Sequence, residues 1–142
     1  PGFIEAHQTV SADRWDPELV PDEAGRTTRP EPTCPVEVAL AAIAGRWTTL
    51  LLRDLMAGPR SYGQIRAALP TLSDKVLADR LRDLQERGLV ERRVHPGFPT
   101  TTTYALTPAG RLLRPLLVEL YRTGQALQSA HAGGHGDRPA PV

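Results

Sequence analysis

One stretch, residues 73–88, constrains the fold more than any other part of the chain. Leu77, Leu81 and Leu84 recur in it at spacings of four and three residues, which puts them on one stripe of a helix. Four charged residues fall near the opposite stripe: Lys75, Asp79, Arg82 and Glu86. The stretch is therefore predicted to be a helix with one buried face and one face free to contact a partner.

Both ends of this helix carry residues that favour helix termini. Ser73 can accept a free backbone N–H as an N-cap, and Gly88 can take the left-handed conformation that ends a helix. Residues 61–69 carry apolar side chains at helical spacing, and Pro70-Thr71-Leu72 separates them from Ser73. Two short helices joined by a tight turn are a helix-turn-helix candidate, with the second as the reading helix.

The net charge of +1 hides an uneven distribution along the chain. Residues 1–33 hold three arginines against seven acidic residues, whereas residues 34–128 hold thirteen basic against eight acidic residues. The basic excess belongs to the part that carries the predicted helices, which suits a polyanionic partner such as nucleic acid. With 142 residues and 40% hydrophobic content, one domain with a modest core is expected.

Composition divides the chain into three expected segments. Residues 1–33 are predicted to be an acidic, proline-rich and partly ordered arm, residues 34–128 the folded domain, and residues 129–142 a disordered tail. A single cysteine excludes an internal disulfide framework and a multi-cysteine zinc site. No apolar run reaches the length of a membrane span and no signal-peptide core follows the first residues, so a soluble cytoplasmic protein without membrane contact is expected.

The remaining elements follow from the same kinds of pattern. Helices are predicted over residues 36–44 and 47–56, the second of them buried on most sides. A β-hairpin is predicted over residues 89–106, around a loop that contains prolines and a glycine. A long helix is predicted over residues 108–128, with a kink or a break near Pro115.

Helices, a helix-turn-helix, a hairpin and a long helix follow one another in the order of a winged-helix domain. Short motifs occur along that order: Cys34-Pro35-Val36, Gly45-Arg46-Trp47-Thr48, Leu52-Arg53-Asp54-Leu55, Gly58-Pro59, Tyr62-Gly63-Gln64-Ile65, Leu77 with Arg80-Leu81-Arg82, Gly88-Leu89-Val90, and Tyr104-Ala105-Leu106-Thr107 with Gly110. On this series the chain resembles the HxlR-type bacterial transcriptional regulators, a MarR-like winged-helix family. The resemblance implies a mainly α fold with a small β-hairpin wing, dimeric through its terminal helices.

The docking geometry of a reading helix brings residues near its N-terminus to base edges. Five residues at the start of the helix are therefore predicted to contact bases: Ser73, Lys75, Val76, Ala78 and Asp79. Arg82, further along the helix, is predicted to lie nearer a phosphate. Asp79 cannot bind phosphate; it either accepts from a cytosine amino group or orients Lys75 or Arg82. The alternative for this face is a solvated surface without a ligand.

Further DNA contacts are expected from the helix before the turn and from the wing: Tyr62, Gln64, Arg66, Arg92, Arg93, His95 and Thr101. The alternative for Tyr62 is a place in the core. In the wing, Thr100–Thr103 stand where the family usually offers an arginine. Threonine hydroxyls can hydrogen-bond phosphate oxygens, and equally these residues can serve only as good strand formers.

The resemblance assigns the dimer interface to the two terminal helices. Leu113, Leu120 and Leu127 recur every seven residues, as a helix packed along a partner helix requires. The predicted interface residues are Val36, Leu40, Leu113, Leu117, Leu120 and Leu127. A homodimer would insert two reading helices into successive major grooves, roughly 34 Å apart, on a pseudo-palindromic operator, with repression favoured over activation.

Cys34 stands immediately before the first predicted helix, whose N-terminal dipole favours a thiolate. Some HxlR-type regulators sense oxidants or electrophiles through a cysteine at this place, so the resemblance implies a redox switch with an oxidant as effector. The alternative is an N-cap residue without reactivity.

No catalytic site, cofactor or metal centre is expected. His7, His95, His131 and His135 lie on the arm, the wing and the tail, so none is placed to act as a base for Cys34. The spacing of His131 and His135 suits a metal, but in a glycine-rich tail they are expected to be solvated. A second function that keeps the fold is a winged-helix module that senses a small molecule or binds a protein partner, with weak or no DNA binding.

Overall fold

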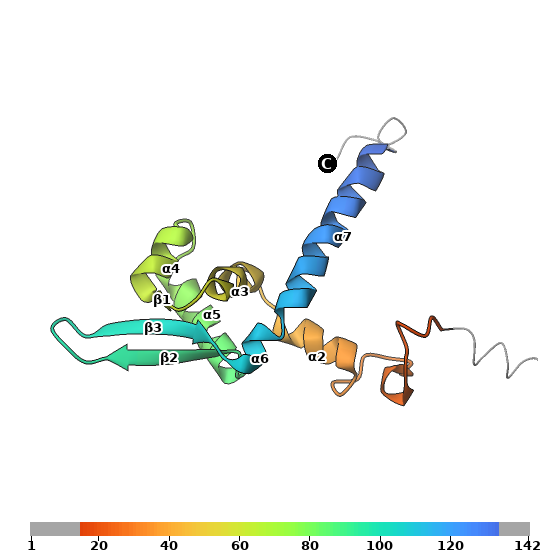
Figure 1. The fold of residues 1–142 in the computed structure, drawn as a ribbon, viewed down its shortest axis with the longest axis horizontal. Helices are drawn as coiled ribbons and strands as arrows, with labels where there is room; N and C mark the ends of the chain where they lie inside the picture. Colours follow the sequence, from red (N-terminus) through yellow and green to blue (C-terminus); the bar gives the residue numbers. More distant parts are fainter. Residues whose placement is uncertain (1–14, 134–142) are drawn as a thin grey trace, which may run out of the picture. The chain divides into compact units, whose positions relative to one another are not determined.

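The computed structural model describes residues 15–133. It is mainly helical with one small antiparallel sheet, as predicted (Figure 1). The chain divides into two compact units between Ala44 and Gly45, whereas the sequence predicted a boundary between residues 33 and 34. The helix that follows Cys34 therefore belongs to the first unit.

The first unit contains η1 (Glu23–Gly25) and α2 (Pro35–Ala42), which contact each other. Pro35 occupies the first turn of α2, where its missing N–H costs no hydrogen bond. The helix ends at Ala42, two residues before its predicted end. None of its residues is buried. The apolar face predicted there is thus not covered within the described chain.

The core of the second unit is built around α3 (Thr48–Met56). Leu51, Leu52 and Leu55 are at most 1% exposed and form one buried stripe. Thr49 and Arg53 are exposed, so the helix is buried along one side and not, as predicted, on most sides. The two helices of the predicted helix-turn-helix follow it in the chain as α4 (Tyr62–Ala68) and α5 (Asp74–Glu86) (Figure 1).

The ends of α5 are as the sequence predicted. The Ser73 hydroxyl accepts the backbone N–H of Val76 at 3.2 Å, and Gly88 has a φ of +74°, in the left-handed region. The leucine stripe is fully buried; its members are Leu77, Leu81 and Leu84.

The wing consists of β2 (Val90–His95) and β3 (Thr101–Leu106), paired antiparallel with Arg93 opposite Thr103. A third strand, β1 (Arg60–Ser61), pairs with the other edge of β3, so the strand order is β1-β3-β2. A strand of two residues has no periodicity, and the sequence therefore did not predict it.

Thr107, which directly follows β3, is hydrogen-bonded to the two residues that precede β2. Its hydroxyl donates to the Gly88 carbonyl at 2.6 Å and accepts the N–H of Gly110 at 3.1 Å, while its own N–H donates to the Leu89 carbonyl at 3.0 Å. Gly110 lies against the same carbonyl, because a Cβ at this position would lie 2.2 Å from the oxygen of Leu89. Only glycine fits this contact.

The long C-terminal helix is broken into α6 (Pro108–Arg111) and α7 (Arg114–Gly133), as the position of Pro115 predicted. α7 contacts α3 and carries no buried residue along its twenty positions (Figure 1). It continues to Gly133, so residues 129–133, which the sequence assigned to a disordered tail, are helical. Residues 134–142, with His135, lie outside the described residues, as does the arm before residue 15, with His7.

The contact at Gly110 gives a stability prediction. Gly110→Ala forces the wing and α6 apart and is expected to lower the free energy of unfolding by about 1–3 kcal/mol or more, the cost of overpacking. The matched control is Gly124→Ala in α7, where an added Cβ meets nothing within 4 Å. That variant is expected to gain about 0.5–1 kcal/mol of helix propensity. Urea unfolding of both variants measures the difference, and equal stabilities would contradict the contact.

Candidate nucleic-acid interface

The turn between α4 and α5 is held by one arginine. Arg66 donates through Nη1 to the carbonyls of Leu69 and Leu72, and its Nε lies 2.8 Å from the Asp74 carboxylate. Tyr62 donates its hydroxyl to the same carboxylate at 3.3 Å. These bonds fix the start of α5 against α4, so its first turn is presented in one orientation.

The polar groups of Arg66 and Tyr62, both predicted to contact phosphate, are thus bonded within the protein in this structure. The guanidinium of Arg66 is engaged with the turn, and burial, followed by the charge of Asp74, raises the pKa of Tyr62. Gln64, also predicted to contact phosphate, forms a capping box with Ser61: its Oε1 accepts the Ser61 N–H at 2.9 Å, and the Ser61 hydroxyl accepts the Gln64 N–H at 3.1 Å. The capping side of Gln64 is therefore occupied by the start of α4.

The outward face of α5 carries a three-residue ion network. Asp79 accepts from Lys75 at 3.1 Å and from Arg82 at 3.3 Å, through different carboxylate oxygens. The hydrogen bond from Lys75, with the charges of Lys75 and Arg82, lowers the pKa of Asp79. Asp79 is thus placed to orient both cations, while its contact with a cytosine amino group stays a prediction. Ser73 and Ala78 are exposed on this helix and Val76 is half-buried.

The inward side of α5 is tied to the start of α3. Arg80 donates from Nε to the carbonyl of Arg46 at 2.9 Å and pairs with Asp83 at 3.0 Å. Arg46 lies in the turn before α3, where both Gly45 and Trp47 have positive φ. Sequence reasoning missed this role of Arg80, because a bond between positions 34 residues apart has no local signal.

The two arginines of the wing point to opposite faces of the hairpin. Successive residues of a strand alternate in direction, so Arg92 shares a face with buried Tyr104 and Arg93 shares the other with His95. Arg93 pairs with Glu91, and the His95 ring nitrogen Nε2 lies 2.8 Å from the Thr103 hydroxyl. Thr101 lies opposite His95 and is exposed.

Cys34 caps α2 and is 7% exposed. The backbone N–H of Glu37, followed by that of Val36, lowers the pKa of the thiol. A hydrogen bond with the Thr27 hydroxyl acts in the same direction, while burial opposes it. The thiolate is thus favoured relative to an ordinary cysteine.

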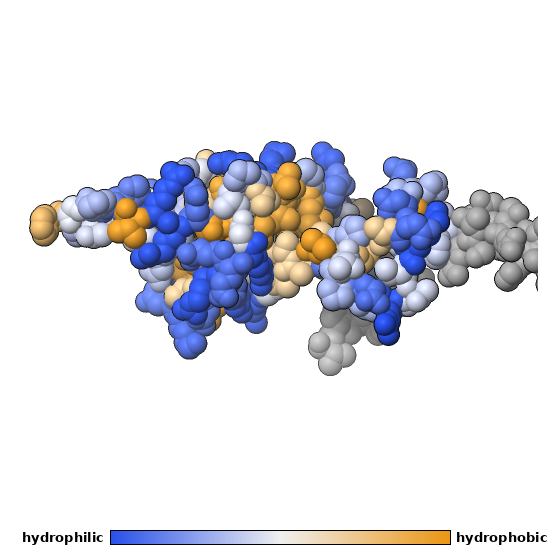
Figure 2. Space-filling model, turned by 90° about the horizontal axis from the view of Figure 1, so that it is seen from below, coloured by the Kyte–Doolittle hydropathy of each residue, from blue (hydrophilic) through white to orange (hydrophobic). Residues whose placement is uncertain are grey.

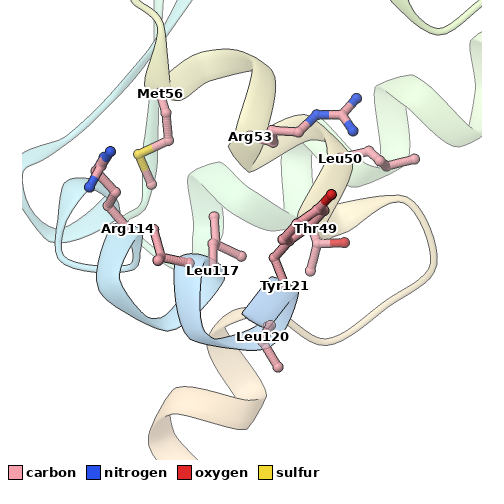
Figure 3. Close-up of a pocket in the computed structure, with 9 residues that line it drawn as sticks. Thr49, Leu50, Arg53, Met56, Arg114, Leu117, Leu120 and Tyr121 are labelled. Carbon is pink, nitrogen blue, oxygen red and sulfur yellow. The ribbon is translucent and has the colours of Figure 1, made fainter. Parts of the chain in front are cut away.

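Apolar side chains of both terminal helices are uncovered. Val36 and Leu40 of α2, and Leu120 and Leu127 of α7, are 44–57% exposed, whereas Leu113 is buried. Leu117 lines a cavity of about 490 Å³ between α3 and α7, with Met56 and Arg114 at one end and Leu50 at the other (Figure 3). The lining residues are Thr49, Leu50, Arg53, Met56, Arg114, Leu117, Val118, Leu120 and Tyr121.

Within residues 15–133, no three histidine, cysteine or carboxylate side chains are grouped as a metal site would need. No helix in that part of the chain is long and apolar enough to span a membrane.

The model of the HxlR-like helix-turn-helix family matches residues 42–132. The chain belongs to this family. It is 40% identical over 88 residues to the HTH-type transcriptional regulator YvaP of Bacillus subtilis, a match covering 61% of this chain and 82% of that protein. The protein is thus a transcriptional regulator of the HxlR type, and its winged-helix fold is that of the family.

Two regulators of known structure are similar to this chain in sequence and fold. The redox regulator HypR in its oxidized form is 31% identical, with a TM-score of 0.60 over 66% of this chain and 96% of that one. The reduced form of the transcriptional regulator YodB from B. subtilis is 34% identical, with a TM-score of 0.58 over 63% and 88%. YodB has also been solved after diamide treatment and with bound quinone.

The hydrogen bonds of Arg66 predict that its loss lowers stability more than the loss of Arg82, the arginine on the outward face of α5. Arg66→Ala leaves the turn carbonyls and Asp74 without their donor, and is expected to lower the free energy of unfolding by about 1–3 kcal/mol. Arg82→Ala removes only an exposed pair, and is expected to change it by less than about 0.5 kcal/mol. Chemical denaturation monitored by circular dichroism measures both, and the assignment fails if the two variants are equally stable.

Proposed function

We propose that this HxlR-type regulator is a homodimeric, sequence-specific DNA-binding protein that acts as a repressor. The observation that carries the proposal is the presentation of α5: its leucines are buried, its first turn is fixed by Arg66, and its opposite face is open to solvent. A helix held in this way can enter a major groove, which is wide enough to admit it.

In the proposed complex the first two turns of α5 face base edges. The residues assigned to this contact are Ser73, Lys75, Val76, Ala78 and Asp79, with Arg82 directed to a phosphate. The network around Asp79 supports this division, because it holds both cations at defined positions on the helix surface. Asp79 also lowers the net positive charge offered to the backbone, so part of the affinity has to come from outside α5.

The wing supplies that remaining charge. Arg92 and Arg93 lie on opposite faces of the hairpin, which suits contacts to the two phosphate backbones on either side of a groove. His95 and Thr101 complete the proposed wing contacts. Tyr62 and Gln64 stay assigned to phosphates of the DNA backbone near α4. Arg66 acts on DNA binding indirectly, because it fixes the position of α5.

The uncovered apolar residues of α2 and α7 support dimerisation through the terminal helices. α7 has no buried residue, and Leu120 and Leu127 are exposed at seven-residue spacing. Val36 and Leu40 add apolar surface from α2. A dimer would cover these side chains and set the two reading helices roughly 34 Å apart, one turn of the operator.

Cys34 is proposed as the sensor of oxidants or electrophiles. Its lowered pKa supplies the thiolate that reacts, and the neighbouring regulator HypR is described as a redox regulator. With a single cysteine in the chain, the available products are an intersubunit disulfide, a mixed disulfide, a sulfenic acid or an adduct.

The cavity between α3 and α7 supports a second candidate function, a module that senses a small molecule with weak or no DNA binding. Its volume of about 490 Å³ and its leucine and methionine lining suit an organic molecule. The two functions differ in their response to salt, because affinity for DNA falls steeply as salt concentration rises.

The DNA-reading face is tested by removing its two cations together. Lys75→Ala with Arg82→Ala is expected to weaken binding to the DNA upstream of the protein's own gene by roughly tenfold to a hundredfold. The dependence of affinity on salt should also become less steep, by about 1 for each phosphate that the variant no longer neutralises. Gel shifts at several salt concentrations measure both effects.

The control for this variant is Arg26→Ala with Arg29→Ala, which also removes two exposed cations paired with glutamates, but in the first unit. It is expected to bind like the wild type. Unchanged affinity of the α5 variant, or an equal loss in the control, would refute the assigned face.

The sensor is tested by treating the protein with diamide. Wild-type Cys34 is expected to form a disulfide or adduct visible by mass spectrometry, and to change DNA affinity at least severalfold. Because the pKa of the thiol is lowered, its alkylation should reach half its maximal rate at a lower pH than that of an ordinary cysteine. Cys34→Ser should be insensitive to diamide, and a modified wild type with unaltered affinity would rule the switch out.

A further inference from the structure

The tip of the wing exposes an aromatic ring that has no role in the fold. Phe98 lies in the loop between β2 and β3, and at 106% relative exposure its side chain packs against nothing in the described chain. Val94, near the end of β2, is half exposed as well. Figure 2 shows an apolar surface at the extreme left end of the molecule, where the loop between β2 and β3 lies in Figure 1.

The position of this ring distinguishes it from an ordinary surface hydrophobe. Single apolar residues scattered over a protein surface need no explanation. Phe98, however, lies in the loop that closes the β2–β3 hairpin, and this hairpin projects from the domain in Figure 1. Its neighbours Gly97 and Pro99 offer no large side chain to cover the ring. Such a side chain is available to enter a narrow groove of a partner.

The charge around the tip indicates the chemistry of that partner. The wing carries Arg92, Arg93 and His95 against one acidic residue, Glu91, which pairs with Arg93, and no acidic residue follows until Glu119. The two arginines lie on opposite faces of the hairpin, one on each side of the line that ends at Phe98. An apolar tip flanked by cations on both faces is complementary to a narrow groove whose walls are formed by sugars and whose two rims are anionic phosphates, as in the minor groove of DNA.

We propose that Phe98 is an apolar wedge that enters the minor groove of DNA beside the site read by α5. The ring packs against sugars and partly unstacks one base step, while Arg92 and Arg93 contact the phosphates of the two strands. The proposal rests on the proposed DNA-binding function and adds to it a contact that needs no charge at the tip. It also gives the wing a DNA contact that does not depend on an arginine at positions 100–103, where this chain has threonines.

A wedge of this kind confers a preference for particular DNA sequences without a hydrogen bond to any base. Pyrimidine–purine steps, TA and CA above all, unstack more easily than others. Operators with such a step at the flank reached by the wing should therefore bind more tightly. In a dimer the preference would occur twice, once on each side of the centre of the operator.

The test compares Phe98→Ala and Phe98→Leu with the wild type on a duplex from the region upstream of the protein's own gene. Phe98→Ala is expected to weaken binding about fivefold to thirtyfold, and Phe98→Leu, which keeps an apolar wedge, by less. Because no charge is removed, the dependence of affinity on salt should stay unchanged, unlike that of the Lys75 and Arg82 variant. Leu19→Ala, at a 73% exposed leucine of the first unit, is the matched control and should bind like the wild type.

Permanganate footprinting reads the wedge directly, since it oxidises thymines that are unstacked. The wild type should produce a reactive thymine at a flank of the protected site, and Phe98→Ala should abolish it while protection of the central site remains. If the wild type binds the duplex and both readouts are the same for Phe98→Ala, the wedge is refuted and the DNA-binding function stands. If the wild type binds no DNA in a salt-dependent way, the proposed function itself fails. A lowered oligomeric mass of Phe98→Ala would also overturn the wedge, because the ring would then contact another protein chain.

Discussion

Burial of the leucine stripe of α5 is the constraint on which the rest of the structure depends. With Leu77, Leu81 and Leu84 excluded from solvent, only one rotation of the helix about its axis is compatible with the core. That rotation decides that Lys75 and Arg82 face outward. A chain without this stripe would lose the orientation of its polar face together with its core, so stability and the proposed DNA recognition depend here on the same three side chains.

Arginine has two separate uses around the candidate interface. Arg66 bonds to backbone carbonyls of the turn before α5, and Arg80 bonds to a carbonyl of the turn before α3. They are cationic residues beside the reading helix, yet their hydrogen bonds are directed into the protein. The basic excess of the domain therefore overstates the charge available to a polyanion, and the outward cations of α5 are already partly neutralised by Asp79. Affinity then has to be shared with the wing.

The sequence predicted the features that are set by neighbouring residues. It missed the features that are set by contacts between distant positions in the chain. The caps of α5, the hairpin and the break before Pro115 all depend on residues within a few positions of one another, and each is confirmed. The strand β1, the exposed side of α3 and the engagement of Arg66 depend on the tertiary arrangement, which periodicity does not encode. Among the residues assigned to base contacts, Val76 and Asp79 are half-buried and the others are exposed, and their use in binding stays a prediction.

The bond between Arg80 and the Arg46 carbonyl joins the reading helix to the turn before α3. The carbonyl is held by α5 across a turn with two positive φ angles. α3 begins directly after this turn and contacts α7, the proposed dimer helix. Because α3, α5 and α7 are linked in this way, a shift of α7 in the proposed dimer would carry α5 with it as a body. A change at the dimer contact of α7 would then act on the distance between the two reading helices rather than on their shape, and an operator with fixed half-site spacing is sensitive to that distance.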